Sequence, residues 1–463
     1  MTSTADPRGT LDRFFGISER GSSVRTEVIA GATTFMTMAY ILFVNPVILG
    51  KVADAAGNRL PFSAVLTSTA MVAAAATIAM GLLANLPLAL AAGMGLNSVV
   101  AFQLVATMHL TWPQALGVVV AEGLAVTLMV LSGFRRAVSE AVPLGMKRAL
   151  GIGIGLFLTI IGFVEAGFVS RSSTGPVPVT LGKAGHLAGF PVLLFVLTLL
   201  FTAWLVLRNV KGALLIGILA ATVVAVLARL AFGDASGFRP GEVTIPGSIF
   251  APPDFSQVGR FDFSFVGALG AGAAALTVFS LMLSDFFDTV GTVVAVGSEA
   301  RYLDASGDYP RPTTVLLVDA LAATAGGVAG CSSATTYVES ASGAAAGGRT
   351  GLASVVTGLL FAACLFISPV AGVVPAQATG AVLVLVGFFM MRDVGSLPWN
   401  DLTEAIPSFL VLTVMPFTYS ITNGIGVGFI SLVLLKLLAG RGREVHPLLY
   451  LTSLGFAVYF VVN

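Results

Sequence analysis

The chain has little charge and few side chains that bind metals or form disulfides. Of its 463 residues, 10% are charged, whereas a soluble domain averages about 25%. It has three histidines and two cysteines, and Cys331 and Cys364 lie in apolar surroundings that suit buried thiols better than a disulfide or a metal site. The formal charge of +1 provides no basic face for nucleic acid, and no Gly-x-x-x-x-Gly-Lys loop is present to bind a nucleotide. We therefore expect no cofactor, no metal and no nucleic acid partner.

Apolar residues dominate what is present. The sequence is 56% hydrophobic and contains 53 glycines. Its apolar windows approach the roughly 20 residues with which a helix crosses a bilayer. They predict an all-α polytopic membrane protein, with no large soluble domain between its fourteen segments: 28–50, 62–84, 88–107, 112–133, 149–168, 187–207, 212–232, 266–297, 312–329, 331–347, 351–374, 377–391, 403–422 and 425–439.

The distribution of positive charge predicts the orientation of these segments. The N-terminal stretch Met1–Glu27 is polar and has no apolar core of the signal-peptide type. If it lies in the cytoplasm, 17 of the 24 Lys and Arg residues fall on the cytoplasmic side, as the positive-inside rule requires. Both termini are then cytoplasmic. Outside the segments, Phe134–Leu150 and Leu11–Ile17 are interpreted as interfacial helices. For the short apolar run Pro447–Val462 we favour an interfacial helix over a half-span or a fifteenth crossing.

Two matched interruptions indicate where a ligand binds. Fourteen segments divide into two repeats of seven, and an odd-numbered repeat must re-enter the membrane with inverted topology. The third segment contains the Gly-rich stretch Ala92–Ser98, and its counterpart, the tenth, contains Gly330–Thr336. Glycines also allow close helix packing. However, interrupted helices at corresponding positions of two repeats mark the substrate site in transporters, and we favour that interpretation here.

Carboxyl groups lie close to these interruptions. Glu339 directly follows the second one, where it is able to bind N–H donors of a ligand or to pair with Arg349. Asp285 and Asp288 are three residues apart on one face of the eighth segment, so both cannot be ionised at low cost and one is a candidate proton carrier. Asp319, in the ninth segment, is equally suited to coupling and to a structural hydrogen-bond network.

The remaining polar groups define the kind of ligand. Asn97 offers a donor and an acceptor within an apolar segment. Glu122 and Glu165 are more isolated, and Glu165 is expected to reach toward the membrane surface. No Arg or Lys lies beside the interruptions to neutralise an anion. These groups therefore suit a neutral, planar ligand that forms hydrogen bonds.

Four motifs identify a family. They are Thr33–Pro46, Ala92–Asn97, Phe287–Thr292, and Thr335–Ser340 with the following Gly343–Gly351. In combination they resemble the AzgA-like purine permease branch of the nucleobase–ascorbate (xanthine/uracil permease) transporter family, over nearly the whole chain. The resemblance implies a core domain, 28–133 and 266–374, a gate domain, 134–265 and 375–463, and a cytoplasmic tail, 1–27. It also implies proton-coupled uptake of adenine, guanine or hypoxanthine across the cytoplasmic membrane, and a homodimer formed through the gate domain.

The resemblance also assigns roles to residues. Glu339 is similar to the carboxylate that binds the purine, Asp288 to its partner, Asn97 to a polar residue of the third segment, and Asp319 to an acid that organises the site. The list of expected substrate-binding residues is completed by Tyr337, Ser340, Phe35 and Phe287, and that of expected proton-coupling residues comprises Asp288, Glu339, Asp319 and Asp285. The sequence departs from the family at Val99 and Val100, where an aromatic residue is common, so Phe35, Phe287 or Tyr337 is expected to stack on the purine.

Three alternatives remain open. The first is a carrier of xanthine, uracil or another small planar solute on the same fold. The second is a membrane-embedded enzyme that uses Asp285 and Asp288 for hydrolysis, and it should release product without any ion gradient. The third is a passive channel, which should show flux that does not depend on protons. The form of the eighth-segment motif favours a purine transporter over the first alternative, and no His-rich or Cys-rich metal set supports the second.

Overall fold

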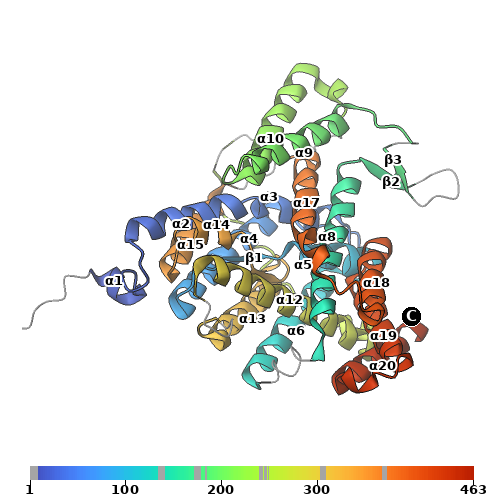
Figure 1. Ribbon diagram of the computed structural model, residues 1–463. Helices are drawn as coiled ribbons and strands as arrows, with labels where there is room; N and C mark the ends of the chain where they lie inside the picture. Colours follow the sequence, from blue (N-terminus) through green and yellow to red (C-terminus); the bar gives the residue numbers. More distant parts are fainter. Residues whose placement is uncertain are drawn as a thin grey trace, which may run out of the picture.

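The structure is a computed structural model that describes residues 9–133, 141–171, 179–182, 185–238, 243, 248, 250–302, 309–367 and 373–462 (Figure 1). The first half contains α1 (Thr10–Phe15), α2 (Val24–Met38), α3 (Ile41–Lys51), α4 (Phe62–Ala79), η1 (Met80–Ala84), β1 (Leu90–Ala92), α5 (Met94–Ser98), η2 (Val99–Thr107), α6 (Trp112–Leu131), α8 (Leu144–Glu165), β2 (Val169–Arg171), β3 (Val179–Leu181), α9 (Phe190–Leu207), α10 (Ala213–Phe232) and η3 (Gly233–Ser236). The second half contains α11 (Phe265–Leu269), α12 (Ala271–Ala300), α13 (Pro312–Ala329), β4 (Ala334–Thr336), α14 (Ser340–Ala345), α15 (Gly351–Ala363), η4 (Cys364–Phe366), α17 (Ala376–Met390), η5 (Met391–Ser396), α18 (Leu402–Thr418), α19 (Ile421–Leu438), η6 (Gly442–Glu444) and α20 (Pro447–Val462).

The predicted all-helical membrane architecture is confirmed. Ten helical stretches among the described residues are long and apolar enough to cross a bilayer, and shorter apolar helices cover Met94–Thr107, Gly351–Phe366 and Leu402–Thr418. Together with α14 they account for the fourteen predicted segments. The C-terminal run is helical as well and forms α20, which packs against α19 and α12.

The two interrupted segments meet in a short antiparallel sheet. Strand β1 pairs with β4, with Leu90 opposite Thr336 and Ala92 opposite Ala334. The ladder continues on both sides, because Gly93 N donates to Ser333 O at 2.9 Å and Tyr337 N donates to Ala89 O at 2.9 Å. Extended backbone inside a bilayer needs partners for its polar groups, since no water is available to replace them. Each interruption therefore satisfies the backbone of the other.

Close approach at this sheet depends on small residues. A Cβ added at Gly93 would lie 2.8 Å from Thr335 Cγ2, so a larger residue there would push the strands apart. Gly330 ends α13 with a φ of +89°, a conformation that favours glycine, and turns the chain into the second interruption. The glycine-rich texture of these stretches thus has a geometric cause.

The helices pack in two sets (Figure 1). In one set, α6 lies against α12 and α13, and α15 lies against α2 and α4. In the other, α8 lies against α17 and α18, and α9 lies against α10 and α17. An ion pair between Lys51 at the end of α3 and Glu165 at the end of α8 joins the two sets. The predicted division into core and gate domains, with the boundaries given above, stays a prediction.

The structure corrects one sequence interpretation outside the site. Leu144–Leu150 does not belong to a separate interfacial helix; it forms the first turns of α8, which begins directly after Pro143. Residues 134–140 of that predicted helix lie outside the described residues. Glu165, expected to reach toward the surface, forms an ion pair with Lys51, whose side chain is 38% exposed. The two cysteines are free thiols, as predicted.

A charged cluster closes the C-terminal end of the fold. Arg441 donates to Asp401 at 2.8 Å and to Glu444 at 2.7 Å, and Asp401 also caps the N-terminus of α18. Hydrogen bonds from Thr403 and Arg441 lower the pKa of Asp401 to about 2, and those from Arg441 and Lys436 lower the pKa of Glu444 to about 2. Both groups are therefore fully ionised at neutral pH.

Candidate functional site

Glu339 lies between β4 and α14 and is held by the first segment. Tyr40 Oη donates to Glu339 Oε1 at 2.5 Å, and Thr37 Oγ1 donates to the backbone oxygen of Glu339 at 3.4 Å. The alternative pairing with Arg349 does not occur, because that guanidinium donates to the carbonyl oxygens of Ala344 and Gly348 instead. One oxygen of the Glu339 carboxyl, Oε2, thus remains available to a ligand.

Asp288 lies on α12, which packs against α14, the helix that Glu339 directly precedes. It is partly buried, and its carboxyl group interacts electrostatically with that of Glu339 and with the Tyr337 hydroxyl. Among the described residues no hydrogen bond engages the Asp288 carboxyl, so it too offers acceptor oxygens. The structure therefore brings together the two carboxyl groups that the sequence singled out for substrate binding.

Asp319 and Thr289 fix the strand beside these carboxyl groups. Asp319 Oδ1 accepts from the backbone N–H of Thr336 at 3.0 Å, and Oδ2 accepts from Thr289 Oγ1 at 2.7 Å. Thr289 Oγ1 also lies 2.8 Å from Thr335 Oγ1. These contacts are buried and join α12, α13 and β4. The sequence left two roles open for Asp319, proton coupling and a structural hydrogen-bond network. Its contacts are those of a structural hydrogen-bond network.

Two further predicted site residues make structural contacts. Tyr337 is buried, and its hydroxyl donates to Ala92 O at 2.5 Å, which reinforces the pairing of the interrupted segments. Ser340 Oγ accepts from Ala89 N at 2.9 Å, so this hydroxyl is occupied by backbone. Ser340 thus holds the first interruption in place, and its part in substrate binding stays a prediction.

Asn97 lies in α5, and its side-chain amide makes no hydrogen bond in the described part of the chain. Its side chain is fully buried, and neither Oδ1 nor Nδ2 has a hydrogen-bond partner among the described residues. An amide buried without partners loses the hydration of both its donor and its acceptor. A ligand that supplies both kinds of partner would restore them.

The aromatic candidates are dispersed. Phe35 packs edge-on against Phe361 of α15, with ring centroids 5.1 Å apart. Phe287 is nearly buried beside Phe286, and the Lys147 ammonium lies 5.3 Å from its ring centroid. Of these three aromatic residues, Tyr337 interacts electrostatically with the carboxyl groups of Glu339 and Asp288. That one of these aromatic rings stacks on the ligand stays a prediction.

Sequence reasoning missed three contributors. Tyr40 orients Glu339, and Thr289 anchors Asp319; both stood within motifs that identified the family, and the motifs were the only signal for them. Glu122 looked isolated along the sequence. In the structure, Glu122 Oε2 accepts from Ser333 Oγ at 3.2 Å, beside the second interruption.

The assembled site is acidic and supplies many acceptors. Glu339 and Asp288 offer acceptor oxygens, Asn97 lies on α5, which contacts α12, and no basic side chain forms an ion pair with these groups in the described part of the chain. No group of three or more His, Cys, Asp and Glu residues in the described ranges could hold a metal ion. The arrangement favours an uncharged ligand with several N–H groups.

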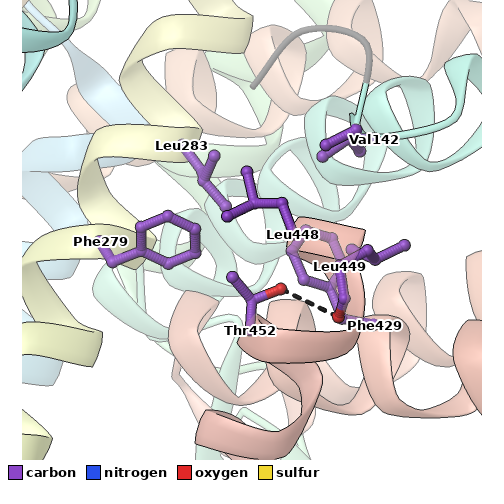
Figure 2. A pocket seen from close by; sticks show the side chains of 8 residues that line it. Val142, Phe279, Leu283, Phe429, Leu448, Leu449 and Thr452 are labelled. Carbon is purple, nitrogen blue, oxygen red and sulfur yellow. Dashed lines mark hydrogen bonds between the residues drawn. The ribbon is translucent and has the colours of Figure 1, made fainter. Parts of the chain in front are cut away.

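A separate cavity is unsuited to such a ligand. Figure 2 shows it between α12, α19 and α20, lined by Ala141, Val142, Phe279, Leu283, Phe429, Leu448, Leu449 and Thr452. Thr452 supplies the only side-chain polar group of this lining, and its hydroxyl donates to Leu449 O at 3.1 Å. The polar chemistry of the chain lies at the interrupted segments instead.

The chain is similar to known transport proteins. A family model described as "Permease family" matches residues 25–427. The chain is 38% identical to the adenine permease AdeP of Escherichia coli strain K12, covering 99% of this chain and 98% of the relative. It is 37% identical to the guanine/hypoxanthine permease PbuG of Bacillus subtilis strain 168, covering 97% and 99%. Its fold is similar to the transmembrane domain of a cyanobacterial bicarbonate transporter, BicA, with a TM-score of 0.63, 15% identity, and coverage of 87% and 97%.

Proposed function

This chain belongs to the Permease family, and from that premise we propose that it imports purine nucleobases (adenine, guanine or hypoxanthine) in symport with protons. Family membership makes it a multi-pass membrane transport protein and not an enzyme. The observation that carries the proposal is the pair of carboxyl groups at the interrupted segments, with Glu339 oriented by Tyr40 and Asp288 interacting with it electrostatically without a hydrogen bond.

The hydrogen-bonding pattern of a purine suits this pair. A purine is planar and neutral and carries ring N–H groups and, in adenine and guanine, an exocyclic amino group beside acceptor nitrogens. In the proposal its donors bind Glu339 Oε2 and Asp288, and the amide of Asn97 pairs with a donor and an acceptor of the ring. The names of the relatives AdeP and PbuG support this substrate class. Glu339, Asp288 and Asn97 are thus the proposed substrate-binding residues, with Tyr337 beside them.

Proton coupling follows from the same charges. Two carboxyl groups that interact with each other and with no cation repel when both are ionised, so one proton bound at Asp288 or Glu339 stabilises the loaded site. A neutral loaded site also crosses the apolar barrier at lower cost than a charged one. In the proposal, the proton gradient thereby drives purine accumulation.

Alternating access is proposed to occur by movement of the core helices against the gate helices. Pairing of β1 with β4 makes the two interrupted segments one body, so the site moves as a unit. The Lys51–Glu165 ion pair joins α3 to α8 and would break when the sets separate at that end. We place the protein in the cytoplasmic membrane with both termini inside, and as a homodimer through the gate domain.

The test is uptake of radiolabelled adenine, guanine, hypoxanthine, xanthine and uracil by cells that lack their own permeases. Saturable purine uptake that an uncoupler abolishes, and that Glu339→Gln abolishes while the exposed α12 acid variant Glu299→Gln does not, would support the proposal. Preference for xanthine or uracil would support the same fold with another planar solute. Flux insensitive to the uncoupler would indicate a channel and contradict symport.

A further inference from the structure

A second carboxyl pair lies deeper in the fold than Glu339 and Asp288. Glu122 is in α6 and Asp285 is in α12, and both side chains are 0% exposed. Helix α6 packs against both α12 and α13 (Figure 1). The two carboxyl groups lie within hydrogen-bond reach of each other across the contact between α6 and α12.

This pair has few donors. Ser333 Oγ supplies one hydrogen bond, to Glu122 Oε2 at 3.2 Å. The other oxygen of Glu122 and both oxygens of Asp285 accept no hydrogen bond of good geometry among the described residues, although the Thr335 hydroxyl interacts with the Asp285 carboxyl group. Buried carboxyl oxygens without a well-placed donor would each carry the desolvation cost of an unsatisfied polar group, about 1–3 kcal/mol or more when charged.

In the described part of the chain no cation interacts with these two carboxyl groups, and Lys147 of α8, which packs against α12, lies over the Phe287 ring. Helices α6, α12 and α13 contain no Lys, Arg or His; their titratable residues are Glu122, Asp285, Asp288, Glu299 and Asp319. The charged groups nearest to the pair are Asp319 and Asp288, both acidic. A second negative charge at the pair would therefore meet only further negative charge.

We propose that Glu122 and Asp285 share one exchangeable proton, and that Glu122 is a proton-coupling residue of this transporter. A proton placed between the two carboxyl groups turns one oxygen into a donor and the other into its acceptor. It also removes one of two adjacent buried charges. The proposal rests on the proposed proton symport, and it adds a residue that the family motifs did not include.

The contacts connect this proton to the substrate site. Ser333 binds Glu122 and directly precedes β4, and β4 carries Thr335 and Thr336, which Thr289 and Asp319 hold. Loss of the shared proton would repel Glu122 from Asp285 and change the contact between α6 and α12. Through Ser333 that change reaches the strand beside Glu339. Glu122 thus acts on the site through β4 and does not touch the substrate.

Infrared spectroscopy of the purified protein tests the proton directly. The carbonyl stretch of a protonated carboxyl group at neutral pH should be present in the wild type and lost in Glu122→Gln, whose amide resembles the protonated acid in shape. Asp285→Asn, the second variant, should lose the same band, whereas Glu299→Gln should keep it. If neither pair variant loses a protonated carboxyl band, the shared proton is absent and the inference is wrong, whatever the substrate.

Transport in proteoliposomes tests the coupling. Hypoxanthine exchange without a gradient and accumulation driven by a pH gradient are measured separately. For one proton per purine, a gradient of one pH unit supports about tenfold accumulation. Glu122→Gln should retain exchange and lose that accumulation, and Glu299→Gln should retain both. Accumulation by Glu122→Gln equal to wild type would overturn the coupling role while leaving symport intact. Wild-type exchange of hypoxanthine with no response to the gradient would overturn symport and the coupling role together.

Discussion

Replacing Tyr40 by Phe removes one hydroxyl and leaves the ring. That hydroxyl donates to the carboxyl group of Glu339 at 2.5 Å, and Tyr40 is completely buried. A hydrogen bond to a charged group contributes about 1.5–3 kcal/mol. If all of that free energy serves to hold Glu339 for the substrate, its loss corresponds to about ten- to 150-fold in transport at limiting purine concentration. We expect the KM to rise more than kcat falls, because the variant keeps the carboxyl group and loses its orientation.

The assay is initial uptake over a range of purine concentrations, with protein amount measured at the membrane. Tyr450→Phe is the matched control, because its hydroxyl also donates a hydrogen bond, to Gly442 O at 2.9 Å, but far along the chain in α20. It should leave both kinetic parameters within about twofold, since its expected effect is on stability alone. Wild-type kinetics for Tyr40→Phe would refute the view that this contact orients the binding carboxylate.

Three further predictions concern stability. Thr289→Val should lower the melting temperature and abolish transport, because it leaves an oxygen of the Asp319 carboxyl group without its donor, which costs about 1–3 kcal/mol of stability. Thr277→Val removes a buried hydroxyl that has no partner among the described residues, so it should be neutral or stabilising. Equal melting temperatures for the two variants would contradict this reasoning. Replacing Lys51 and Glu165 by Met singly and together should give a coupling free energy of about 0.5–3 kcal/mol in a thermal double-mutant cycle, and additive effects would show that the ion pair contributes nothing. Asp401→Asn should destabilise the protein at neutral pH, and because the pKa of Asp401 is lowered by folding, the difference from wild type should shrink as the pH falls below about 4 toward about 2; a difference that grows in acid would reverse the sign of the argument.

Composition and periodicity were sufficient to predict the helical membrane fold, because a bilayer-spanning helix needs a long apolar run that any sequence must display. The interruptions at Ala92–Ser98 and Gly330–Thr336 were equally visible, since glycine and serine are poor helix formers. Their pairing as β1 and β4 could not be predicted. Register between two strands far apart in the chain depends on contacts that leave no local pattern.

The site shows the same limit. Glu339 and Asp288 stood out because charged residues are rare in apolar segments, and the structure brings them together. Ser340 was also predicted to line the site, and the sequence did not reveal that its hydroxyl accepts a hydrogen bond from the backbone of Ala89. Glu122 looked isolated because its partners Asp285 and Ser333 come from the other half of the chain. The hydrogen-bond partners of a polar side chain come from distant parts of the chain. The local sequence therefore does not predict whether that side chain binds ligand or protein.

The strand pairing of the interrupted segments also constrains biosynthesis. The backbone of β1 finds its partner only when β4 is made, about 240 residues later. At about 5–20 residues per second, this leaves about 12–50 s in which a non-helical stretch of the nascent chain has unpaired polar groups within or beside the bilayer. During that interval the first repeat has to be sheltered by the insertion machinery or remain incompletely inserted. The same hydrogen bonds that complete the transport site therefore make the two halves of the protein dependent on each other for membrane assembly.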